Sequence, residues 1–153
     1  MKTAVLFLCA LPLLAAIEGT VINKTTGQPQ AGVKVSLTKL GQGGMQAAGS
    51  TTSGANGAFK LHPAAAPAHL LQALWQDVTY NIQLQPGAAT TGIKVEVYDA
   101  LAKVSAVDAT QHMILVETDG KEVVVNETVI FQNDSQTTWY DPKTGSLRFT
   151  VPP

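Results

Sequence analysis

Few residues of this sequence combine the type and the spacing that catalysis or metal binding requires. The three histidines, His62, His69 and His112, lie in separate segments, and none has a second ligand at the short spacing typical of zinc sites. Paired carboxylates for acid–base catalysis would have to come from residues that nothing in the sequence brings together. These are Asp99, Asp108, Glu117, Glu127 and Asp134. We therefore expect no metal site, no cofactor and no enzymatic activity.

Motifs for covalent catalysis and for phosphate binding are also missing from the sequence. Its serines lie mainly in turn-like segments, and no nucleophile-elbow motif occurs. The glycines of "GQGGMQAAGSTTSGANG" do not follow a phosphate-loop pattern and precede no helical segment. Charged residues make up 14% of the chain and the net charge is −1, so no basic surface is expected to attract nucleic acid.

Aromatic side chains are the remaining candidates for ligand contact, because they can stack on sugar rings. Trp75 and Tyr80 fall on the apolar side of their segments and are expected in the core. Tyr98 falls on the polar side of its segment, and Trp139 and Tyr140 must point to opposite faces, so that one of them can face outward. Tyr98, Trp139 and Tyr140 are thus the candidate ligand-stacking residues.

The N-terminus has the three parts of a secretory leader. Lys2 is followed by the apolar run "AVLFLCALPLLAA", and Ala15 and Ala16 supply small residues for cleavage. The run is shorter than the roughly 20 residues of a membrane-spanning helix, and Pro12 interrupts it. We expect residues 1–16 to be a signal peptide, which would remove Cys9 and leave a mature protein without cysteine or transmembrane segment. Export without disulfides is compatible with a bacterial envelope, in the periplasm, at the outer membrane or as a secreted protein.

Beyond the leader, apolar and polar residues alternate with the period of two that is typical of β-strands. The clearest runs are residues 33–38, 78–85 and 93–98. Turn-forming clusters such as "TTGQPQAG" and "SGANG" separate them, as in a sandwich of short strands. The segment "PAAAPAHLLQALWQ" could form a short helix, but its prolines favour a strand from about His69 to Trp75. The sequence predicts an all-β fold.

Four short motifs in order resemble a carboxypeptidase regulatory-like domain, a member of the transthyretin-like and prealbumin-like sandwiches. They are the G-x-V of 19–21, the T-G-x-P of 26–29, the G-V-x-V-x-L of 32–37 and the G-x-F of 57–59. The resemblance covers roughly residues 17–98 and implies an Ig-like/transthyretin-like β-sandwich with a carbohydrate-binding-like fold. Such domains accompany metallocarboxypeptidases and also occur, without catalytic activity, in bacterial exported proteins.

Residues 101–153 are expected to form a smaller antiparallel β unit. "HMILVETDGKEVVVNETVIFQN" reads as a hairpin around Asp119-Gly120, where a two-residue turn would set Glu117 opposite Glu122 and a three-residue turn would set it opposite Lys121. We prefer the three-residue turn, which avoids a like-charge pair. A second hairpin is expected from "QTTWY" and "SLRFTV". Four strands with one apolar face indicate either a truncated domain or one completed by packing on the first domain.

The expected function is that of a non-catalytic extracytoplasmic β-sandwich module with a structural or interaction role in a bacterial envelope or secreted protein. Its partner would be a protein or a glycan of the cell envelope. The alternatives are a carbohydrate-binding module and an accessory domain of a metallocarboxypeptidase.

Overall fold

The structure of the protein is a computed structural model that describes residues 16–41, 44–62, 70–85 and 88–148. The expected leader lies outside these residues except for Ala16, and His69 also lies outside them. The described chain is all-β: its residues form strands, turns and bends and no helix. No segment of it is therefore a helix long and apolar enough to cross a membrane.

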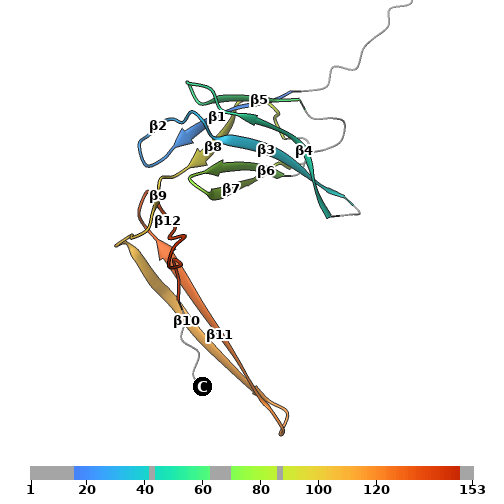
Figure 1. Ribbon diagram of the computed structural model, residues 1–153. Coiled ribbons are helices and arrows are strands. Elements are labelled where there is room, and N and C mark those ends of the chain that lie inside the picture. Colours follow the sequence, from blue (N-terminus) through green and yellow to red (C-terminus); the bar gives the residue numbers. More distant parts are fainter. Residues whose placement is uncertain (1–15, 42–43, 63–69, 86–87, 149–153) are drawn as a thin grey trace, which may run out of the picture.

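The first 98 residues supply two four-stranded sheets, which form one body in Figure 1. In the first sheet, β1 (Ile17–Asn23) is central. It pairs antiparallel with β2 (Gln28–Pro29) and β5 (Ala58–Leu61), and parallel with β8 (Ile93–Val97). The second sheet has the antiparallel order β4 (Gly44–Thr52), β3 (Lys34–Gly41), β6 (Leu70–Trp75) and β7 (Val78–Gln83). The strand predicted up to Trp75 is confirmed as β6.

The core lies between the sheets and follows the predicted alternation. Val35 and Leu37 of β3 and Val95 and Val97 of β8 are fully buried, and Phe59 of β5 is 5% exposed. Tyr80 and Ile82, also predicted to be apolar-side residues, are half-buried and pack against this cluster. The sandwich predicted from period-two patterning is therefore confirmed.

At two positions of the sequence motifs, Gly19 and Gly27, the structure disfavours any residue with a side chain. Gly27 ends the turn between β1 and β2 with a φ of 73°, and its N–H donates to the carbonyl of Asn23. Gly19 lies on β1 beneath the ring of Phe59, its cross-strand partner, and beside β8. A Cβ at Gly19 would lie 2.2 Å from the Ile93 carbonyl oxygen and 2.6 Å from Cζ of Phe59. The G-x-V and G-x-F motifs thus form one contact across the sheet.

The described residues from 99 to 148 form four strands. They are β9 (Ala100–Leu101), β10 (Val107–Thr118), β11 (Val123–Asn133) and β12 (Thr138–Trp139). β10 and β11 pair antiparallel, as expected, whereas β12 pairs parallel to β9. The "DPKTG" turn forms, with the Gly145 N–H donating to the Asp141 carbonyl, but residues 146–148 form no strand. The Ser146 hydroxyl accepts from the Asp141 N–H and donates to the Trp139 carbonyl. Residues 149–151 of the expected strand lie outside the described residues.

Candidate functional site

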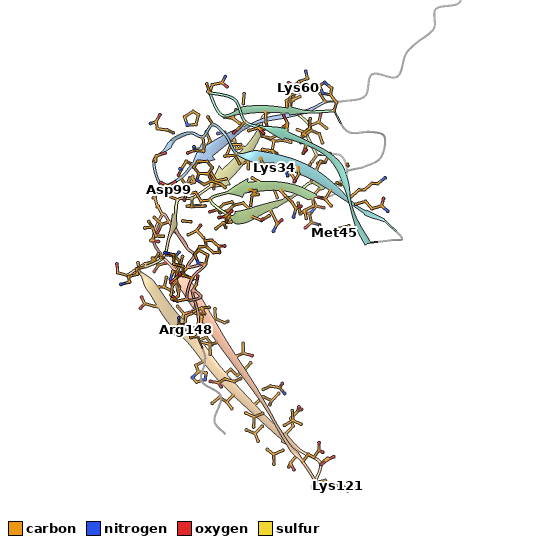
Figure 2. The ribbon with its side chains drawn as sticks, in the orientation of Figure 1. Lys34, Met45, Lys60, Asp99, Lys121 and Arg148 are labelled. Carbon is orange, nitrogen blue, oxygen red and sulfur yellow. The ribbon has the colours of Figure 1, made fainter. Side chains whose placement is uncertain are left out.

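The most distinctive feature of the molecule is the pair β10–β11, here called the arm, which projects from the sandwich. Figure 1 shows the two strands leaving the sandwich side by side, and Figure 2 places Lys121 at their far end. Eleven residues of β11 at about 3.4 Å each give the arm a length of about 37 Å. Within the described residues, β10 and β11 pair with each other and with no other strand.

The loop at the tip of the arm differs from both predicted turns. Thr118 pairs with Val123 and Glu117 with Val124, so four residues, 119–122, form the loop. The Asp119 side chain accepts from the backbone N–H groups of Lys121 and Glu122, each at 2.9 Å, and Gly120 has a φ of 86°. These bonds, from Glu122 first and then from Lys121, lower the pKa of Asp119. The preferred pairing of Glu117 with Lys121 is therefore wrong, because the Asp119 side chain stabilises a longer loop.

The register divides the arm into two faces. Residues directly opposite each other share a face, and successive residues along a strand point to opposite faces. The first, here called the apolar face, consists of six cross-strand rows, numbered from the tip: Thr118–Val123, Val116–Val125, Ile114–Glu127, His112–Val129, Ala109–Phe131 and Val107–Asn133. A bulge at Thr110, between the fourth and fifth rows, keeps the rows on one side. The other face is more polar and carries Asp108, Gln111, Glu117, Asn126, Thr128 and Gln132. It also carries four apolar side chains, Met113, Leu115, Val124 and Ile130, each about half exposed.

Most apolar side chains of the arm are exposed. Val123 is 65% exposed, Val116 59%, Val125 58% and Ile114 56%. Along β11, Val123, Val125, Val129 and Phe131 all lie on the apolar face. The alternative in which this face packs on the first domain is wrong, because the arm points away from the sandwich. Contiguous exposed apolar surface of this kind marks an interaction site.

One hydrogen-bonded polar pair lies in the middle of the apolar face. The Nε2 atom of His112 lies 2.6 Å from Oε1 of Glu127, on the diagonal between the third and fourth rows. His62, the other described histidine, is exposed near the end of β5. Among the described residues no group of histidine, cysteine and acidic side chains is arranged to hold a metal ion.

A hydrogen-bonded cluster fixes the junction between the sandwich and the arm. The buried Asn23 at the end of β1 donates from Nδ2 to Oδ1 of Asp99 at 2.7 Å and to Oε1 of Gln30 at 3.0 Å. Trp75 Nε1 donates to the same Asp99 oxygen at 3.4 Å, and the Asp99 N–H donates to Thr25 Oγ1. Asp99 directly precedes β9, so these bonds determine where the chain leaves the sandwich.

Replacing Asp99 with alanine tests this junction. The buried Asn23 amide would lose one acceptor, so we expect the free energy of unfolding to fall by about 1–3 kcal/mol in urea denaturation. Asp108→Ala, an acidic residue exposed on the arm, is the control and should change it by less than about 0.5 kcal/mol. Equal effects of the two substitutions would contradict the role of Asp99.

The three aromatic candidates do not form one stacking platform. Tyr98 is half-buried, and its ring centroid lies 6.0 Å from that of Tyr80, whose hydroxyl is hydrogen-bonded to the Tyr98 carbonyl and to Thr138. Tyr98 lines a groove of about 590 Å³ between β7 and β8, which also carries Asn81, Lys94 and Glu96. Trp139 and Tyr140 are half-buried and do not line this groove; Trp139 Nε1 donates to the Ala102 carbonyl instead.

The chain was compared with protein-family models, with curated proteins and with solved structures, and none of these comparisons found a match.

Proposed function

We propose that the protein is a non-catalytic interaction module of a bacterial envelope or secreted assembly, in which the β-sandwich positions the arm for contact with another polypeptide. The observation that carries this proposal is the exposed apolar face of an arm about 37 Å long. A protein partner can cover such a face and can also pair with the open strand edges. The leader pattern of residues 1–16 supports export.

The resemblance of residues 17–98 to carboxypeptidase regulatory-like domains agrees with a supporting role for the sandwich. Its strands use their apolar residues in the core, and the Asn23–Asp99 cluster ties the arm to it. The sandwich is thus the base, and the arm is the part that makes contact.

A carbohydrate-binding module is the second candidate, supported by the groove beside Tyr98. Its polar lining of Asn81, Lys94 and Glu96 could contact sugar hydroxyls. However, the Tyr98 ring packs beside Tyr80 and is half-buried, which reduces the area for stacking. Sugar binding that is lost in Tyr98→Ala and kept in an arm-deleted protein would favour this candidate. An accessory role beside a metallocarboxypeptidase would be supported by a zinc-protease sequence in the same polypeptide.

Photo-crosslinking in cells that export the protein tests the main proposal. A photo-reactive amino acid at position Val125 is expected to give covalent adducts to protein, because this side chain lies on the apolar face. The same amino acid at Lys34, which is exposed on the sandwich, is the control and should give few or none. Absence of adducts from Val125, or equal yields from both positions, would contradict the proposal.

A further inference from the structure

The arm cannot be a stable end state by itself. Isolated two-stranded hairpins are marginal in water, and three or more strands or a packed face are needed for independent stability. The apolar face of the arm leaves Val116, Val123 and Val125 more than half exposed. We therefore expect this face to be covered in the assembled state.

The polar His112–Glu127 pair at the centre of the face restricts what the cover can be. His112 and Glu127 lie in the third and fourth of six rows, with two rows on either side of them. Lipid would not suit this surface, because ionisable side chains on the lipid face of a strand are destabilising near the bilayer centre. A uniformly apolar protein surface would also leave the pair without polar neighbours.

The order of the rows is self-complementary. A two-fold axis across the arm, between the third and fourth rows, places the rows of one copy over those of another in reverse order. Val116 and Val125 then lie over Ala109 and Phe131 of the second copy, and the outermost rows cover each other in the same way. The two wholly apolar rows, the second and the fifth, therefore meet each other, and the outermost rows, which also carry Thr118 and Asn133, meet each other.

The same operation brings the two His112–Glu127 pairs together. Each Glu127 then shares a row with His112 of the second copy, whereas the two Glu127 side chains fall in adjacent rows. The parallel arrangement instead places the two Glu127 side chains in one row, where like charges repel. Charge complementarity thus favours the antiparallel arrangement.

We infer that the occupant of the apolar face is the same face of a second copy of this chain, packed antiparallel about a two-fold axis at His112 and Glu127. This inference rests on the proposed function and names its partner. Two arms packed face to face, at the roughly 10 Å spacing of stacked sheets, form a four-stranded bridge with a sandwich at each end.

Two variants of the full chain, with opposite charges at positions 112 and 127, test this inference. In the positive variant, His112→Lys with Glu127→Lys, four lysines would meet at the axis; in the negative variant, His112→Glu, four glutamates would meet there. By sedimentation analysis, we expect the original protein to dimerise and each variant to dimerise about tenfold or more weakly. The equimolar mixture should recover a one-to-one heterodimer, which only contact between copies can produce.

The control variant places two lysines on the other face of the arm, at the same distance along it as His112 and Glu127. Met113→Lys with Thr128→Lys alters a directly opposed pair on the more polar face and should leave dimerisation within about threefold of the original. An unchanged melting temperature of the sandwich would verify folding of every variant.

Three results would overturn the inference: a monomeric original protein at about 100 μM, a mixture that stays monomeric, or a control that weakens the dimer as much as the two variants do. If the protein is monomeric but position Val125 still crosslinks to a different protein in cells, the inference fails while the proposed function stands.

Discussion

Replacing Phe59 with alanine is expected to lower the free energy of unfolding of the sandwich by about 3–5 kcal/mol. The ring is 5% exposed, belongs to the core cluster and lies over Gly19 of β1. Its removal therefore leaves a cavity beside a glycine that has no side chain to fill it. Urea denaturation followed by tryptophan fluorescence measures the loss.

Phe131→Ala is the matched control for this experiment, because Phe131 lies on the arm and is 37% exposed. It should change the unfolding of the sandwich by less than about 1 kcal/mol. A loss below about 1 kcal/mol for Phe59→Ala would show that the ring does not stabilise the core as its burial indicates.

Separating the two halves of the chain is expected to have the largest effect of all. Residues 17–98 contain both sheets of the sandwich and the whole buried apolar cluster, so this fragment should unfold cooperatively by itself. Residues 101–153 contain the exposed arm and the short β9–β12 pair, and should show no cooperative melt as a monomer.

Proton NMR spectra and thermal melts of the two fragments measure this difference. The full chain is the reference, and dilution keeps the 101–153 fragment monomeric. A dispersed spectrum with a cooperative melt from that monomeric fragment would show that the arm is an independent domain, and would argue against its need for a cover.

The sandwich could be predicted from the sequence because strand alternation and burial have the same cause. Residues such as Val35, Leu37, Val95 and Val97 alternate with polar residues, and each is fully buried. A glycine that a turn requires can also be predicted from the neighbouring residues, as at Gly27, which has a positive φ. The contact between Gly19 and Phe59 could not be predicted, because it joins residues whose spacing depends on the pairing of β1 with β5.

The candidate site was harder to predict, because it depends on the register of one hairpin. The preferred three-residue turn pairs residues of the same parity, which places His112 and Glu127 on opposite faces. The actual four-residue loop pairs residues of opposite parity and brings them to 2.6 Å. Alternation also shows which arm residues share a face, but not what covers that face. The exposure of the candidate aromatics could not be predicted from alternation either. Tyr98 and Trp139 are half-buried because they contact residues distant in sequence.

The parallel pairing of β1 with β8 has a consequence for the time course of folding. β1 is the first strand of the chain and the central strand of its sheet, yet its register partners on one side are residues 93–97. A chain that emerges N-terminus first must therefore hold β1 with an open edge until β8 has followed, and closing so long a loop slows folding. The sandwich should thus assemble late and in nearly one step, only after its last strand, β8, has followed β1.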